Sequence, residues 1–230
     1  MSNKHARIRA IIDAITAFLT DNSASVPAAR LTLARVEATD LNPNAFADLP
    51  PAIPRHEAVL DTAIRNMNDP RLLLLRQALS RAKDDLVWRQ DDMKYYPPGS
   101  DLGEGYISTN LHTLLIGPGA CGFHHDDFTL GLFMLGPRTL YRDHQHDAPE
   151  TYINLSPRTG WRLGDADWVD REAGSIIFNA PNAIHATRSY DQPFLSVFSW
   201  LDNIQGQCAV VQRDDWSMIE AQLRLSDPQP

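Results

Sequence analysis

The 230-residue sequence contains only two cysteines, Cys121 and Cys208, and they do not form a Cys-x-x-Cys pair. Two isolated thiols are too few for a disulfide framework. The formal net charge is −8, so the chain lacks the excess of Lys and Arg that neutralises phosphates in nucleic-acid-binding proteins. We therefore expect a protein of the reducing cytoplasm that binds no DNA or RNA.

Long apolar runs are also missing. No run approaches the roughly 20 residues that span a bilayer. Asp13 interrupts the apolar residues of the N-terminal segment, which has neither the apolar core nor the small-residue cleavage site of a signal peptide. Internal repeats and low-complexity tracts are absent as well. We expect a compact folded chain that does not enter a membrane.

The first hundred residues carry helical patterns. Apolar residues recur at helical spacing from Ile8 to Leu19, which predicts an amphipathic helix ending near Asn22. A proline-rich connector follows at residues 41–55. A second helical pattern at residues 59–67 is broken at Asp69-Pro70, and a third runs through residues 71–90.

From about Gly105 the sequence changes to short runs rich in β-branched and aromatic residues, separated by turn residues. These runs are residues 106–116, 128–135, 139–146, 150–155, 175–180, 184–189 and 194–201. Such closely spaced short strands favour a sandwich or small barrel. Residues 214–225 indicate one closing helix. The predicted organisation is a helical N-terminal cap, residues 1–100, and a barrel with its closing helix, residues 101–230.

The stretch TLYRDHQHDAPETY, residues 139–152, concentrates chemically useful side chains. His144 and His146 are two residues apart, so on a strand both side chains lie on the same face. Residues 147–149 can turn the chain, after which Glu150 and Tyr152 share one face of the next strand. These side chains are expected to converge inside the barrel.

A further imidazole must come from elsewhere in the chain. His185 follows a turn marked by Pro181, at the start of a predicted strand. Together with His144, His146 and Glu150 it makes a set of three imidazoles and a carboxylate. Such a set suits one divalent transition metal, whether Fe(II), Mn, Ni, Co or Zn. The alternative is that these histidines are ordinary polar residues on a half-solvated sheet face.

A second cluster of histidines and aspartates, HHDD, occupies residues 124–127. Adjacent residues on a strand point to opposite faces, so this run cannot present all four side chains to one ion. The cluster also follows a glycine turn. We expect it to form a loop at the barrel rim, where one of its members could touch substrate.

The motif and its surroundings resemble those of the cupin-type dimethylsulfoniopropionate lyases and their lyase-like relatives. The resemblance covers roughly residues 84–202 and rests on the pattern Tyr141-x-x-His144-x-His146-x3-Glu150-x-Tyr152, followed by PNAIH at residues 181–185. It implies a mainly β fold, a cupin barrel (double-stranded β-helix, jelly-roll) with an α-helical N-terminal extension and a short C-terminal helix.

The resemblance also implies roles for individual residues. The implied metal ligands are His144, His146, Glu150 and His185. Tyr152 and Tyr141 match the family's catalytic tyrosines. We take Tyr152 as the base, because it stands beside Glu150 in the motif, and Tyr141 as a second candidate base or as a hydrogen-bond donor to the substrate carboxylate.

The resulting hypothesis is a metal-dependent carbon–sulfur lyase that cleaves dimethylsulfoniopropionate to dimethyl sulfide and acrylate by base-catalysed β-elimination. The alternatives are a lyase-like cupin acting on another small carboxylate, an Fe(II) cupin oxygenase and a non-catalytic carboxylate sensor. The expected partner is a small-molecule carboxylate, and oligomeric state is left open, with a homodimer as one option. Aromatic candidates to surround the sulfonium are Trp88, Tyr95, Tyr96, Tyr106, Phe123, Phe133 and Trp200.

Overall fold

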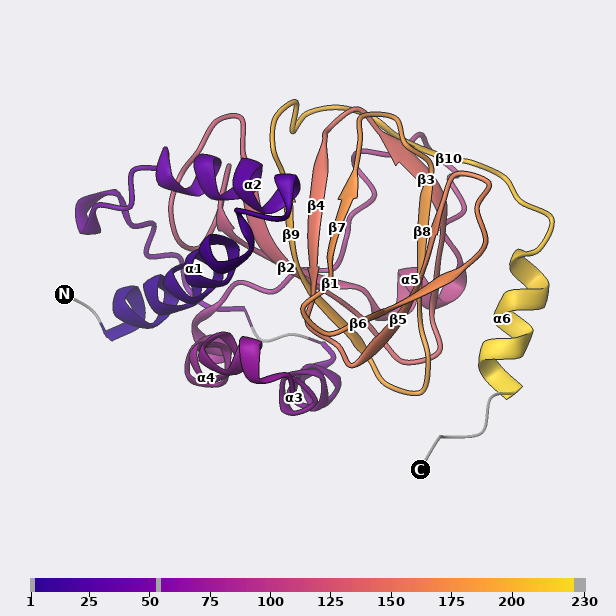
Figure 1. Cartoon of the computed structure of the whole chain (residues 1–230), viewed down its shortest axis with the longest axis horizontal. Coiled ribbons are helices and arrows are strands. Elements are labelled where there is room, and N and C mark those ends of the chain that lie inside the picture. The colour runs from indigo at the N-terminus through magenta and orange to yellow at the C-terminus, as the bar shows by residue number, and fades with distance from the viewer. Residues whose placement is uncertain (1–2, 53–54, 226–230) are drawn as a thin grey trace.

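The computed structural model describes residues 3–52 and 55–225 (Figure 1). Its N-terminal part contains α1 (Asn3–Asn22), α2 (Pro27–Glu37), α3 (Glu57–Arg65) and α4 (Leu73–Ala82), with short 3₁₀ turns at Pro43–Ala45, Pro70–Leu72 and Lys83–Asp85. α1 ends at the predicted residue. α2 was not predicted from the sequence, although its first residue is a proline, which a first helical turn accepts because its N–H would have no partner there.

The remainder of the chain is mainly β-structure. After α5 (Glu104–Thr109) come β1 (Leu111–Ile116), β2 (Thr129–Leu135), β3 (Leu140–His146), β4 (Glu150–Asn154), β5 (Arg158–Leu163), β6 (Val169–Glu172), β7 (Ile176–Asn179), β8 (His185–Ser189), β9 (Phe194–Trp200), β10 (Cys208–Val210) and α6 (Trp216–Leu225). The closing helix is confirmed. Residues 106–109 were predicted as the start of a strand and instead complete α5. The Thr109 hydroxyl bonds back to the Gly105 carbonyl there, four residues earlier.

The strands form two five-stranded sheets that face each other. The first sheet has the order β1-β2-β9-β4-β7 and the second the order β10-β3-β8-β5-β6. Each pairing between named strands of the described residues is antiparallel. Consecutive strands such as β3 and β4 lie in different sheets, so the chain crosses between the sheets repeatedly and closes a barrel.

Side-chain alternation divides the core into an inner and an outer layer. In β2, Leu130, Leu132 and Met134 pack in the same core cluster as the helices, whereas Phe133 and Leu135 belong to the core inside the barrel. Burial on both faces explains why β2 reads as a nearly continuous apolar run.

Helices cover both outer faces of the barrel. The N-terminal helices lie against the first sheet, and α6 lies beyond the second (Figure 1). Trp216, Ile219 and Leu223 of α6 pack with Leu140 of β3.

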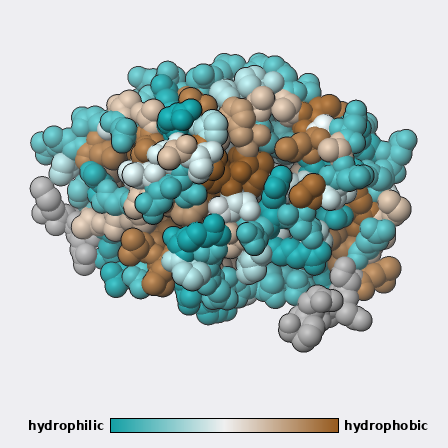
Figure 2. Space-filling model, viewed as in Figure 1, coloured by the Kyte–Doolittle hydropathy of each residue, from teal (hydrophilic) through white to brown (hydrophobic). Residues whose placement is uncertain are grey.

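In the same view the surface is mostly hydrophilic, with hydrophobic residues gathered near its middle, where α2 meets β7 (Figure 2). None of the described helices combines the length and hydrophobicity needed to cross a bilayer.

Candidate metal centre and its cavity

A β-bulge in β3 sets the direction of the side chains that face the cavity. Tyr141 pairs with Thr187 of β8 and His144 pairs with His185, so β3 uses three steps where β8 uses two. Regular alternation would place Tyr141 and His144 on opposite faces. With the extra residue both point into the barrel, and their rings stack 3.9 Å apart.

Three imidazoles meet beside this bulge, from His144 and His146 of β3 and His185 of β8. The Nδ1 atom of each ring lies 2.8, 2.8 and 2.9 Å, respectively, from the backbone carbonyl of a residue two positions away. A carbonyl only accepts hydrogen bonds, so each Nδ1 carries a proton, and Nε2 of His144 and His185 keeps its lone pair. Ligand atoms of the three rings lie within 4.8 Å of one another.

A carboxylate reaches the imidazoles from the opposite sheet. Glu150 begins β4, and its Oε2 atom lies 3.3 Å from Nε2 of His146 and 3.5 Å from Nε2 of His185. The Asn179 side-chain amide donates to Oε2 at 2.9 Å, and the Trp200 indole N–H donates to Oε1 at 3.0 Å. These two hydrogen bonds hold the carboxylate in its orientation toward the imidazoles.

The protonation states follow from burial and from mutual charge. Burial lowers the pKa of His185 to about 4 and holds the pKa of His144 well below its ordinary value. Burial alone would raise the pKa of Glu150, but the charge and hydrogen bond of His146 outweigh it, and the net shift is downward. Burial would lower the pKa of His146, but the charge and hydrogen bond of Glu150 outweigh it and raise that pKa. At neutral pH the site therefore offers neutral imidazoles at His144 and His185 and an ionised carboxylate at Glu150, which are forms that bind metals.

The donor set fits a metal cation. Nε2 of His185 is buried and has no hydrogen-bond partner among the described residues. It faces a carboxylate oxygen, so two acceptor atoms confront each other in a buried space, an arrangement that a cation between them would satisfy. All four side chains are at most 4% exposed. This excludes the alternative that the histidines are ordinary polar residues on a half-solvated sheet face. The three buried histidines could thus bind a metal, and imidazole and carboxylate donors do not select which one.

The cluster opens onto a cavity of about 250 Å³ between the sheets. His144, His146, Glu150 and both candidate tyrosines line it, together with the aromatic residues Tyr95, Tyr96, Tyr106, Phe133, Phe198 and Trp200. Trp88 and Phe123, two other sequence candidates for aromatic contacts, instead pack in the core beneath the helices. Phe198 was not singled out, because its strand reads as ordinary core.

The two candidate tyrosines have different surroundings. Tyr152 lies two residues after Glu150 and faces the cavity, as the spacing predicted. Burial, followed by the negative charge of Glu150, raises the pKa of the Tyr152 phenol well above its ordinary value. The Tyr141 hydroxyl lies 2.8 Å from that of Tyr96, and burial likewise raises the Tyr141 pKa. Without an added positive charge, both are neutral phenols at neutral pH.

Part of the cavity wall comes from a segment that the sequence pattern did not reveal. Residues 89–96, before α5, contribute Arg89, Asp91 and Lys94 to the lining. Helical periodicity ends in this segment, and only its mixed charges and paired tyrosines could have drawn attention to it. The HHDD cluster at residues 124–127 forms a loop outside the cavity lining, tied to α2 by an ion pair between Arg35 and Asp127.

The sequence also matches a known protein family. A family model described as dimethylsulfoniopropionate (DMSP) lyase matches residues 28–196. The chain belongs to the DMSP lyase family. The DMSP lyase DddQ of Ruegeria pomeroyi is 27% identical over 107 residues, which cover 46% of this chain and 53% of that protein. The match therefore spans about half the length of the curated relative.

Two solved structures show the same fold as this family member. One, described with the DMSP lyases RdDddP and RnDddQII, has a TM-score of 0.65 and 22% identity, covering 89% of this chain and all of the other. DddQ from Ruegeria pomeroyi has a TM-score of 0.60 at 22% identity, covering 88% of this chain and 96% of the other. The predicted fold class, a mainly β cupin barrel with helical extensions, is confirmed.

Proposed function

We propose that the protein is a metal-dependent carbon–sulfur lyase that cleaves DMSP to dimethyl sulfide and acrylate. One observation carries the proposal: three Nδ1-anchored imidazoles and Glu150 converge at a cavity that Tyr152 also lines. Family membership makes DMSP the first substrate to test. The proposed ligands are His144, His146, Glu150 and His185.

A divalent cation held by these four side chains would act as a Lewis acid on a substrate carboxylate and would favour the phenolate form of a nearby tyrosine. Hydrogen bonds within the protein orient these four donor side chains. The three Nδ1 hydrogen bonds orient the rings, and Asn179 and Trp200 orient the Glu150 carboxylate.

Tyr152 is the proposed base. Its phenolate oxygen accepts the proton from the carbon next to the substrate carboxylate. The electron pair of that C–H bond forms the carbon–carbon double bond, while the C–S bond breaks and dimethyl sulfide leaves with its bonding pair. No atom is oxidised overall, so the reaction consumes no oxygen. We propose that Tyr141 donates a hydrogen bond to the substrate carboxylate or is the second candidate base.

Aromatic rings supply the proposed environment for the sulfonium. Trp200 and Tyr95 meet edge to face, with ring centroids 5.4 Å apart, at the cavity wall. Phe133 and Phe198 line the same cavity. The negative faces of such rings attract a cation without a fixed counter-charge. A zwitterion could therefore place its carboxylate toward the cation that the four side chains would hold and its sulfonium against the rings.

The test uses protein stripped of metal and reloaded separately with Fe(II), Mn, Ni, Co or Zn. Each sample is incubated with DMSP without oxygen, and dimethyl sulfide and acrylate are quantified. We expect equal amounts of both products with the preferred metal. Tyr152→Phe should reduce turnover at least about 100-fold, because it removes the proton acceptor. Tyr190→Phe, which alters a phenol outside the cavity lining, is the control.

The other outcomes point to the remaining candidates. Metal bound without product from DMSP would reject this substrate and direct the search to other small carboxylates. Oxygen uptake with such a carboxylate would establish an oxygenase instead. Tyr152→Phe with unchanged turnover would reject Tyr152 as the base, and Tyr141→Phe would then be the next variant.

A further inference from the structure

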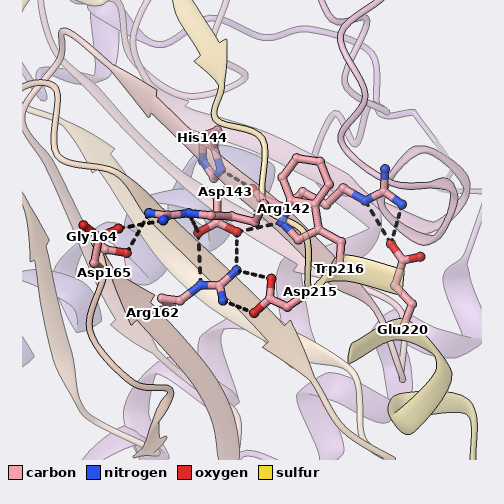
Figure 3. A network of polar contacts seen from close by, with 10 residues as sticks. Arg142, Asp143, His144, Arg162, Gly164, Asp165, Asp215, Trp216 and Glu220 are labelled. Atoms are coloured by element: carbon pink, nitrogen blue, oxygen red, sulfur yellow. Dashed lines mark hydrogen bonds and ion pairs between the residues drawn. The ribbon is translucent and has the colours of Figure 1, made fainter. Parts of the chain in front are cut away.

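A buried network of charges lies behind the strand that carries two of the imidazoles. Asp143, next to His144 in β3, has no solvent exposure. Its carboxylate accepts hydrogen bonds from Arg162 at 3.0 and 2.5 Å and from the indole N–H of Trp216 at 2.8 Å (Figure 3). Arg213 approaches the same carboxylate at 3.6 Å. Two of these partners, Trp216 and Arg213, come from the C-terminal segment.

The neighbouring residue of β3 is held from the same segment. The Arg142 guanidinium pairs with Glu220 of α6 at 2.9 and 2.8 Å, and it lies over the ring of Trp216, 4.9 Å from its centre (Figure 3). Asp215 completes the network by pairing with Arg162. We call residues 213–220 the C-terminal clamp. Their side chains form hydrogen bonds and ion pairs with Arg142 and Asp143, two consecutive residues of β3.

Those two residues, Arg142 and Asp143, are the bulge of β3, since both lie between the paired positions Tyr141 and His144. The clamp therefore holds the one irregularity on which the direction of the His144 side chain depends. Loss of the extra residue from the pairing would turn His144 to the outer face.

The bulge also fixes the ring of His144. The Arg142 backbone carbonyl accepts the Nδ1 proton of His144 at 2.8 Å, and this bond leaves the Nε2 lone pair available to bind a metal. A displacement of Arg142 would loosen that bond and release the ring to rotate or to change its tautomer. Arg142 and Asp143 directly precede His144, so the clamp acts on the His144 ring through the backbone of β3.

We propose that the C-terminal clamp is a positioning element for His144. Through Asp143 and Arg142 it keeps the β3 bulge in place, so that the His144 ring presents Nε2 to the metal. The proposal rests on the proposed metal site. Asp143, Trp216 and Glu220 are positioning residues, because none of them lines the cavity.

Trp216→Phe tests the clamp: it removes the N–H bond to Asp143 and part of the indole while keeping an aromatic ring, so it needs a control that loses the same groups. Trp88→Phe is a matched control. Trp88 is 4% exposed against 5% for Trp216, and its N–H likewise donates one hydrogen bond, to the Lys83 carbonyl at 3.1 Å. Glu220→Gln is a second clamp variant at a partly exposed position.

Two readouts separate positioning from simple stabilisation. The first is Zn(II) affinity of the metal-free protein, measured by competition with a chromophoric chelator. The second is the tautomer of His144 in the metal-free protein, read from ¹⁵N-labelled imidazole resonances and assigned by their loss in His144→Ala. Melting temperature is recorded for each variant, so that a general loss of stability is visible.

We expect Trp216→Phe to weaken Zn(II) binding about 10-fold or more and to give His144 a mixture of tautomers, with Glu220→Gln acting in the same direction. Trp88→Phe should retain wild-type affinity and a single Nδ1–H tautomer. Equal affinities and a single tautomer in all three variants would overturn the proposal. A wild-type protein that binds no metal but loses its single tautomer in Trp216→Phe would reject the metal function and keep the positioning role.

Discussion

Nε2 of His185 lies 3.5 Å from Oε2 of Glu150, across the space between the two sheets. His185 belongs to β8 of the second sheet and Glu150 to β4 of the first. The candidate site therefore takes its imidazoles from one sheet and its carboxylate from the other. A cation bound there would hold the two halves of the barrel together, so metal binding and stability should be linked.

The first prediction concerns this linkage. Zn(II) at about 100 times its dissociation constant should add about 3 kcal/mol to the free energy of unfolding, because only the folded chain brings the donors together. For a domain of this size that corresponds to a rise of about 5–10 °C in melting temperature. Calorimetry of metal-free and loaded protein measures the shift.

Two histidine variants identify the source of the shift. His185→Ala removes one donor and should abolish most of the metal-dependent rise. His124→Ala alters the competing cluster, which lies outside the cavity lining, and should leave the rise intact. A shift lost in His124→Ala and kept in His185→Ala would move the metal site to the exposed loop.

The second prediction is a pH dependence of the metal-free protein. The pKa of His185 is about 4 in the folded chain and about 6.5 in the unfolded chain. Between these values the unfolded chain binds more protons, so the contribution of His185 to stability is complete above about pH 6.5. It is lost progressively as the pH falls to about 4, and it amounts to about 3 kcal/mol.

Urea unfolding between pH 7 and pH 4 measures this contribution. In His185→Asn, which cannot take up the proton, the fall in stability should be smaller than in wild type by that amount. The pKa of His146 is raised, so its contribution to stability changes with pH in the opposite direction. The contribution of His185 is therefore measured by the difference between the two proteins and not by either slope alone. Identical slopes would contradict a buried neutral His185.

The third prediction concerns Cys208, which lines the cavity. Burial raises the pKa of its thiol to about 12, so very little of the reactive thiolate exists at pH 8. Folded protein at this pH should resist alkylation by iodoacetamide at Cys208, and urea should expose the thiol to rapid reaction. Mass spectrometry of the cysteine-containing peptides measures both states. Rapid labelling of Cys208 in the folded protein would contradict this prediction. It would show that the reagent reaches the thiol and that the pKa of the thiol is lower than about 12.

The fourth prediction concerns the indole that holds Glu150. Trp200→Phe keeps an aromatic wall but removes the N–H donated to Oε1 at 3.0 Å, so Zn(II) affinity should fall about 10-fold. Trp161→Phe is the control, since the Trp161 N–H donates to Thr159 within the second sheet. Competition with a chelator compares the two variants. Equal losses would assign the effect to general destabilisation of the barrel.

Local patterns in the sequence were sufficient for much of the candidate site. Period-two alternation predicts that His144 and His146 share a face, and that Glu150 and Tyr152 share another, because these relationships arise within single strands. The apolar face of α1 was equally readable, since helical spacing is a local property. The family resemblance added Tyr141 and the cupin barrel, and the proposed roles of these residues and the division at residue 100 stay predictions.

Long-range pairing decided the rest. The bulge in β3 is defined by a mismatch with β8, about forty residues away in the chain, so no pattern within β3 shows that Tyr141 and His144 face the same side. Residues 89–96 line the cavity only because the barrel closes beside them. The hydrogen bond from the Trp216 indole to the Asp143 carboxylate joins two residues that are 73 positions apart in the sequence. Local propensity and periodicity are written in neighbouring residues, whereas these contacts exist only once distant segments have packed together.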